Sequence, residues 1–177
     1  MAHDTSRMDY GHHLVLYSGG ADSTYFVHQE QTAKHLLHFR GLNDEMTKVA
    51  VANAIRFDRR ITVADFSVGG IAGFFHGPRN EYHALLDASM VLNAGIMAIN
   101  FGMKGLVLGL TREDVDMDIA ALTSILRRAE PRFEILTPLR ETSAKAIRDS
   151  LYRERIPYVS CMISRDCGHC PKCERGC

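Results

Sequence analysis

Short apolar runs alternate with longer amphipathic segments along the chain, and this alternation predicts the fold class. The apolar runs predict strands at His12–Tyr17, His35–Phe39, Ile61–Phe66, Gly105–Leu110 and Phe133–Leu139. The segments between and after them predict helices at Ser23–Lys34, Glu45–Phe57, Glu81–Phe101, Asp118–Ala129 and Ser143–Ile156. Because strands that alternate with helices pair in parallel, we expect an α/β fold with a doubly wound, Rossmann-like sheet of five parallel strands.

In a sheet of this kind the ligand binds beyond the carboxyl ends of the strands, so the residues after each predicted strand are the candidate site residues. One of these connections, residues 67–80, is rich in glycine and longer than a structural link needs. The predicted helix that follows it, at residues 81–101, is apolar nearly all round. We therefore expect that helix to be buried.

The sequence SGGADST at residues 18–24 follows the first predicted strand and opens the first predicted helix. Paired glycines let successive N–H groups turn toward one point, and the helix N-terminus adds its positive end, so this pattern indicates an anion site. The loop has no P-loop lysine and carries Asp22, which tolerates a phosphate only with a cation between them. The pattern favours a magnesium-pyrophosphate site over a plain strand–turn–helix bend.

Four of the five cysteines are spaced C-x5-C-x2-C-x2-C near the end of the chain: Cys161, Cys167, Cys170 and Cys173. Four thiolates at this spacing converge on one ion and complete a tetrahedral, structural zinc site. The segment CGHC also matches dithiol–disulfide oxidoreductases, but there the motif opens a helix, whereas Pro171 follows it at once here. We favour zinc and predict a zinc-binding tail at residues 158–177.

The composition narrows the classes of protein that remain. The 177 residues, 46% hydrophobic and 24% charged, suit a single globular domain over residues 1–177, with residues 1–11 as a flexible arm. Basic and acidic residues both number 21, and this balance predicts no direct nucleic-acid binding. The first residues contain no apolar signal core, and no run approaches membrane-spanning length. We therefore expect a cytoplasmic protein without membrane contact.

The motif SGGxDS resembles the signature of the PP-loop ATP pyrophosphatases, whose fold is that of the adenine nucleotide alpha hydrolases. In that family ATP is split between its α and β phosphates, and a substrate oxygen receives the AMP. The resemblance implies that the loop binds the departing pyrophosphate with Mg²⁺, and that Asp22 and Ser23 are catalytic. The implied ATP-binding residues are Ser18, Gly19, Gly20, Asp22, Ser23, Thr24 and Phe39.

Taken together, the loop and the cysteine tail resemble the 7-cyano-7-deazaguanine synthases of queuosine biosynthesis. The segments VADFS, GPRN, LVLGLTRED, ILTPL and PYVSC match in the family's order. That family converts 7-carboxy-7-deazaguanine and ammonia to 7-cyano-7-deazaguanine, using ATP and adenylated intermediates. The resemblance implies an ATP-dependent C–N ligase with structural zinc and Mg²⁺, small-molecule substrates and a homodimeric assembly.

The same resemblance implies further site residues. Arg79 and Asn80 precede the long helix, and the forked guanidinium of Arg79 suits a carboxylate or phosphate. Glu113 and Asp114 follow the fourth strand and are expected to face the nucleobase or Mg²⁺. Lys145 is the candidate phosphate-contacting lysine, one position later than the family's spacing. For each of the charged residues, a solvated place on the surface is the alternative.

The chain departs from the family directly after residue 114. VDMDIAAL stands where the family has a Tyr-Pro-Asp-Cys-Arg stretch that shapes the deazapurine pocket, and RGLND replaces a glutamine after the second strand. The ATP half of the site therefore matches better than the substrate half. Two alternatives stay open: a PP-loop enzyme that acts on another acid or adenylates or thiolates RNA, and a non-catalytic nucleotide-binding zinc module.

Overall fold

Five strands and five helices alternate in the computed structural model, which describes residues 8–40, 44–66, 81–114 and 117–159. The strands are β1 (His13–Leu16), β2 (His35–Arg40), β3 (Arg60–Asp65), β4 (Gly105–Leu108) and β5 (Glu134–Leu136). The helices are α1 (Ala21–Gln29), α2 (Asp44–Arg56), α3 (Glu81–Asn100), α4 (Ile119–Leu126) and α5 (Ala144–Arg153). The predicted α/β fold is confirmed, element by element and in the predicted order.

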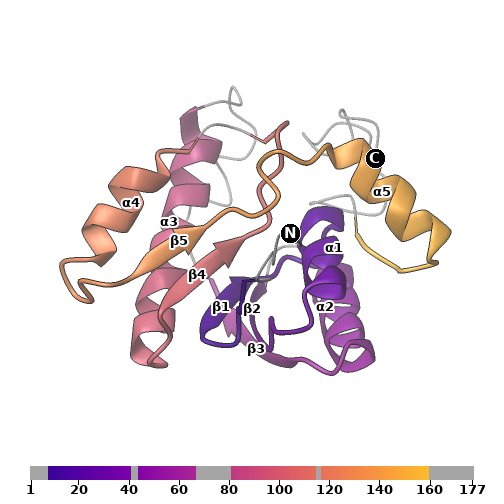
Figure 1. The fold of residues 1–177 in the computed structure, drawn as a ribbon, viewed down its shortest axis with the longest axis horizontal. Helices are drawn as coiled ribbons and strands as arrows, with labels where there is room; N and C mark the ends of the chain where they lie inside the picture. The colour runs from indigo at the N-terminus through magenta and orange to yellow at the C-terminus, as the bar shows by residue number, and fades with distance from the viewer. Residues whose placement is uncertain (1–7, 41–43, 67–80, 115–116, 160–177) are drawn as a thin grey trace, which may run out of the picture.

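The strands form one parallel sheet in the order β3-β2-β1-β4-β5 (Figure 1). The chain builds outward from β1 to β3, then crosses back through α3 to β4 on the other side of β1. Strand order therefore reverses between β1 and β4. In doubly wound sheets the crevice at this switch point, beyond the carboxyl ends of the strands, is where ligands bind.

Two hydrophobic layers enclose the sheet, one on each face. Because successive strand residues point to opposite faces, Val15 and Val107 join a cluster with α1, α2 and α5, whereas Leu14 and Leu106 pack with α3 and α4. Figure 1 shows the same division, with α1, α2 and α5 on one side of the sheet and α3 and α4 on the other. Burial on both faces explains why the strands are continuous apolar runs in the sequence.

The prediction that the long helix α3 is buried holds only for the side that faces the sheet. Val91, Ala94 and Ala98 face the sheet and are buried, but Leu85 is 68% and Ile96 53% exposed. The difference arises because α3 lies in the outer layer and packs against the sheet and α4, so its apolar composition exceeds what that one side can bury. No helix in the described part of the chain has both the length and the apolarity to cross a membrane.

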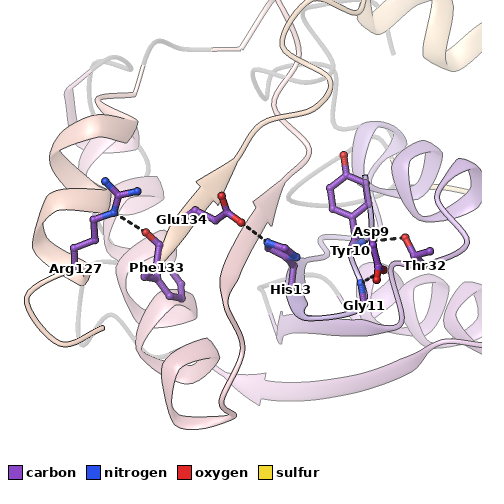
Figure 2. Close-up of polar contacts among 8 residues, drawn as sticks. All are labelled: Asp9, Tyr10, Gly11, His13, Thr32, Arg127, Phe133 and Glu134. Atoms are coloured by element: carbon purple, nitrogen blue, oxygen red, sulfur yellow. Dashed lines mark hydrogen bonds and ion pairs between the residues drawn. The ribbon is translucent and has the colours of Figure 1, made fainter. Parts of the chain in front are cut away.

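Helix α1 and strand β5 are among the elements that are shorter than the sequence predicts. Helix α1 ends at Gln29 because a turn follows, in which Ala33 N–H donates to Glu30 O (3.1 Å), and Thr32 Oγ1 accepts from Tyr10 N–H (3.0 Å; Figure 2). Strand β5 ends at Leu136, two residues before Pro138. A proline has no N–H to donate and cannot continue a strand ladder.

At the amino ends of the strands a buried histidine reaches across the sheet. Nε2 of His13, the first residue of β1, lies 2.8 Å from Oε1 of Glu134, the first residue of β5 (Figure 2). The strand between them, β4, has Gly105 at this level, where an added Cβ would lie 2.8 Å from Glu134 Cγ and 2.9 Å from His13 Cδ2. The missing side chain of Gly105 therefore makes room for the His13–Glu134 contact.

Candidate functional site

The glycine loop (residues 18–23) connects β1 to the first turn of α1 at the carboxyl end of the sheet. Gly19 has a φ of 77°, a conformation that L-residues rarely adopt, and a Cβ added there would lie 2.9 Å from Met46 O. Gly20 is the N-cap of α1, with extended backbone angles. Glycine at position 19 is therefore required both by backbone conformation and by the close approach of α2.

Two serine hydroxyls lie inside this loop. Ser18 Oγ accepts the Gly20 N–H at 3.1 Å and lies 3.1 Å from Ser23 Oγ. Ser23 Oγ in turn donates to Gly20 O at 3.4 Å. Hydroxyls, a loop N–H and a helix N-terminus thus converge at one point, which is the set of groups that binds a phosphate. The anion site at Ser18, Gly20 and Ser23 stays a prediction, and in this structure the three residues hydrogen-bond to one another.

Asp22 and Thr24, the polar residues on either side of Ser23, have different surroundings. Asp22 lies in the first turn of α1 and is partly exposed. A carboxylate there is stabilised by the helix dipole, and its hard oxygens are the ligands Mg²⁺ prefers, so Asp22 fits the predicted magnesium contact. Thr24 is buried, and its hydroxyl lies 3.1 Å from that of Tyr17 in the core. Thr24 therefore joins the start of α1 to the core side chain of Tyr17.

The end of β4 lies against the glycine loop. A Cβ added to Gly109 would lie 3.0 Å from Ser23 N and 3.1 Å from Ser23 Cα, so the backbones of the two loops are in contact at the switch point. Just beyond, Asp114 Oδ2 accepts from the N–H (2.7 Å) and the hydroxyl (2.9 Å) of the buried Thr111. Sequence reasoning missed Gly109, although glycine at the end of a buried strand signals a close backbone approach.

Glu113 caps the last helix. Its Oε2 accepts from the N–H of Ala144, the first residue of α5, at 3.0 Å. This hydrogen bond, with the charge and hydrogen bond of Arg112, holds the pKa of the Glu113 carboxyl below its usual value. Arg140 also joins these loops, since its guanidinium donates to Thr111 O at 3.1 Å. The predicted contact of Glu113 with substrate or Mg²⁺ stays a prediction, beside this capping contact.

Two further predicted site residues lie in the described chain, Lys145 and Phe39. Lys145 projects from the second position of α5; its side chain is 82% exposed and Nζ lies 3.3 Å from Asp149 Oδ2. Phe39, near the end of β2, is half-buried and stacks at a tilt on Phe66, with ring centroids 5.0 Å apart. The place of Phe39 at a carboxyl strand end suits the predicted adenine contact, whereas Lys145 faces solvent.

Six predicted residues lie outside the described part of the chain: Arg79, Asn80, Cys161, Cys167, Cys170 and Cys173. Within the described ranges, no group of three or more His, Cys, Asp or Glu side chains is placed to hold a metal ion. The zinc site in the cysteine tail therefore stays a prediction.

A buried histidine supports the residue that precedes the glycine loop. His38 of β2 lies in the core, with Nδ1 2.9 Å from the Tyr17 carbonyl oxygen and Nε2 2.9 Å from Thr47 Oγ1. A carbonyl only accepts, so Nδ1 carries the proton and donates it to Tyr17. Burial lowers the pKa of His38 below its ordinary value, because the cationic ring is poorly solvated there.

This lowered pKa predicts a specific loss of stability in acid. Below about pH 6.5 the unfolded chain protonates residue 38 more readily than the native protein does, so the free energy of unfolding falls as the pH decreases. Urea denaturation at about pH 7.5 and about pH 5.5 should show a larger loss in the wild type than in His38→Gln, whose amide can still donate to Tyr17. Equal losses in the two proteins would contradict this role.

The parallel sheet, with the glycine loop at its switch point, defines an α/β domain with a doubly wound, Rossmann-like fold. No protein-family model and no curated protein matches the chain. A predicted subunit of a tRNA methyltransferase from Methanocaldococcus jannaschii superposes with a TM-score of 0.61 at 17% identity, over 79% of this chain and 74% of that one. U34-tRNA thiolase NcsA from Methanococcus maripaludis, solved with its [4Fe-4S] cluster, superposes with a TM-score of 0.61 at 12% sequence identity, over 97% of this chain. The chain spans 63% of the thiolase's length, and these likenesses establish the fold.

Proposed function

We propose that this chain is an AMP-forming ATP pyrophosphatase that adenylates a small carboxylic acid. The observation that carries the proposal is the glycine loop at the switch point, where a left-handed Gly19, the Gly20 N–H and the Ser23 hydroxyl meet the start of α1. Gly109 brings the β4 loop into contact with it. An anion site that contains the Asp22 carboxylate and lacks a P-loop lysine suits a departing pyrophosphate better than a transferring terminal phosphoryl group.

Each loop residue has a defined task in this proposal. Backbone N–H groups of the loop and the first turn of α1 bind the β and γ phosphates and stabilise the charge that develops on the leaving group. The hydroxyls of Ser18 and Ser23 exchange their mutual contact for phosphate oxygens. Asp22 would hold Mg²⁺, which neutralises charge on the pyrophosphate when it is bound. Thr24 and His38 keep the loop in place from the core side.

The acceptor we favour is 7-carboxy-7-deazaguanine, with ammonia as the second substrate. A carboxylate oxygen attacks the α phosphorus, the bond to the bridging oxygen breaks, and pyrophosphate leaves with the electron pair. Ammonia then displaces AMP from the acyl adenylate to give an amide. A second adenylation, on the amide oxygen, lets AMP depart with loss of two protons and leaves the nitrile. A formal net charge of zero favours a small acid over a polyanionic substrate.

A second candidate is adenylation of tRNA for thiolation. The fold likeness to a U34-tRNA thiolase that carries a [4Fe-4S] cluster favours it, because this chain also carries a group of cysteines, at residues 161–177. In that case a tRNA base oxygen takes the place of the acid oxygen as the group that attacks the α phosphorus.

One assay separates these candidates. Purified protein with ATP, Mg²⁺ and ammonium should release AMP and pyrophosphate when 7-carboxy-7-deazaguanine is added, and should leave unmodified tRNA unadenylated. Release that depends on tRNA and ignores the acid would favour the second candidate. ATP binding without AMP formation in either case would support a non-catalytic nucleotide-binding module and contradict both.

We also propose that Cys161, Cys167, Cys170 and Cys173 hold a structural zinc ion. Cys170→Ser is expected to abolish stoichiometric zinc and to lower the thermal midpoint, because a short tail with four cysteines depends on its metal for folding. Cys177→Ser is the matched control and should keep both metal and midpoint. Metal analysis that finds iron with inorganic sulfide in place of zinc would replace this assignment with a cluster.

A further inference from the structure

The chain after α5 returns to the glycine loop and hydrogen-bonds to its backbone. Arg155, in the turn that ends α5, has a φ of 53°, and Ile156 packs into the core beside α1 and α2. Three residues later the N–H of Val159 donates to the carbonyl of Gly19 at 3.0 Å. Residues 157–159, the strap, therefore join the far end of the described chain to the first turn of the site.

A buried amide on α2 holds this strap. Nδ2 of Asn53 donates to the carbonyl of Pro157 at 2.7 Å, and the residue is almost fully buried. Asn53 also lies close to the hydroxyl of Tyr17: burial raises the pKa of Tyr17, and hydrogen bonds with Thr24 and Asn53 lower it in part. Asn53 is therefore close both to the strap, through Pro157, and to Tyr17, the residue directly before the glycine loop.

The strap fixes the orientation of one peptide group. The Gly19 carbonyl and the Gly20 N–H belong to the same planar peptide, and in a trans peptide they point in opposite directions; none of the described peptide bonds is cis. With the carbonyl held by Val159, the Gly20 N–H points to the other side, where Ser18 Oγ accepts it at 3.1 Å. Two glycines in a row resist rotation of this peptide less than any other pair of residues.

We infer that the strap orients the Gly19–Gly20 peptide for phosphate binding, and that Asn53 is the positioning residue that holds the strap. The inference rests on the proposed nucleotide function. It assigns to the glycine loop a support from the far end of the described chain, since Pro157 lies 104 residues after Asn53 in the sequence. Asn53 touches no phosphate itself. It acts through Pro157 and Val159 on the direction of the Gly20 N–H.

Binding measurements on Asn53→Ala test this directly. The dissociation constants for magnesium pyrophosphate and for ATP should rise about tenfold or more, since one oriented donor to an anion is lost. The dissociation constant for adenosine, which does not reach the glycine loop, should stay within about twofold. In the amide NMR spectrum the Gly20 signal should move in the unliganded protein. A merely structural role for Asn53 would affect the two kinds of ligand alike.

Val159→Pro provides an independent variant, because it removes the donor to Gly19 without emptying the core. It should reproduce the selective loss of pyrophosphate affinity, and it keeps the test open if Asn53→Ala does not fold. Lys48→Gln, on the exposed side of α2, is the control and should bind like the wild type. Wild-type pyrophosphate affinity in both strap variants would overturn this inference alone. A wild type that binds neither ATP nor pyrophosphate would overturn the proposed function and this inference with it.

Discussion

Replacement of Asp22 by alanine is expected to lower the rate of AMP formation by about 100-fold or more while the protein stays folded. Asp22 is partly exposed in the first turn of α1, so its loss leaves no cavity in the core. Its proposed task is to bring Mg²⁺ to the pyrophosphate, and the loss of one preorganised charge-stabilising group commonly costs two to three orders of magnitude in rate. Initial rates of acid-dependent AMP release, with the circular dichroism spectrum as a check on folding, measure the effect.

Asp44→Ala is the matched control for this experiment. Asp44 also lies in the first turn of a helix that follows a strand, and it is exposed, so its substitution removes the same charge from an equivalent helix position. We expect Asp44→Ala to retain most of the wild-type rate. Similar rates for the Asp22 and Asp44 variants would mean that the carboxylate in the glycine loop has no special part in the chemistry.

The largest effect on stability is expected for Gly105→Ala. In strand β4, between β1 and β5, an added Cβ would lie 2.4 Å from Glu134 O, a backbone atom of the neighbouring strand, and 2.9 Å from the buried ring of His13. Strand β5 must move or the His13–Glu134 hydrogen bond must break. We expect the free energy of unfolding to fall by about 3 kcal/mol, at the upper end of the usual cost of overpacking, in urea denaturation at neutral pH.

Gly102→Ala separates this clash from the general cost of replacing a glycine. Gly102 has a φ of 69°, but nothing lies within 4 Å of an added Cβ, so only the backbone conformation is penalised. A loss of about 1 to 2 kcal/mol is expected there. The account of the strand ends is contradicted if Gly105→Ala costs no more than Gly102→Ala.

The fold was predictable because its determinants are local. Each strand is a short apolar run, each helix is long enough to be distinguished from a strand, and the turn after β1 is marked by paired glycines. The strict alternation of strand and helix then leaves few arrangements other than a parallel, doubly wound sheet. Two departures from the prediction have other origins: a turn at Glu30–Ala33 follows α1, and α3 has more apolar residues than its layer can cover.

The supports of the site were not predictable, because they join residues far apart in sequence. Nothing near Asn53 in the sequence indicates Pro157 as its partner, and nothing near Glu113 indicates the N–H of Ala144. Such contacts follow only from the way helices pack on the two faces of the sheet. Sequence patterns identify the groups that would bind a ligand, whereas the three-dimensional structure identifies the groups that hold them in position.

The central claim is that the turn after β1 binds a leaving pyrophosphate, and the most direct measurement is the fate of the α phosphate of ATP. ATP labelled at that position should yield labelled AMP, together with one equivalent of pyrophosphate, when the protein, Mg²⁺, ammonium and the acid are present. Appearance of the label in ADP with release of inorganic phosphate would contradict the account, because cleavage would then occur at the terminal phosphate.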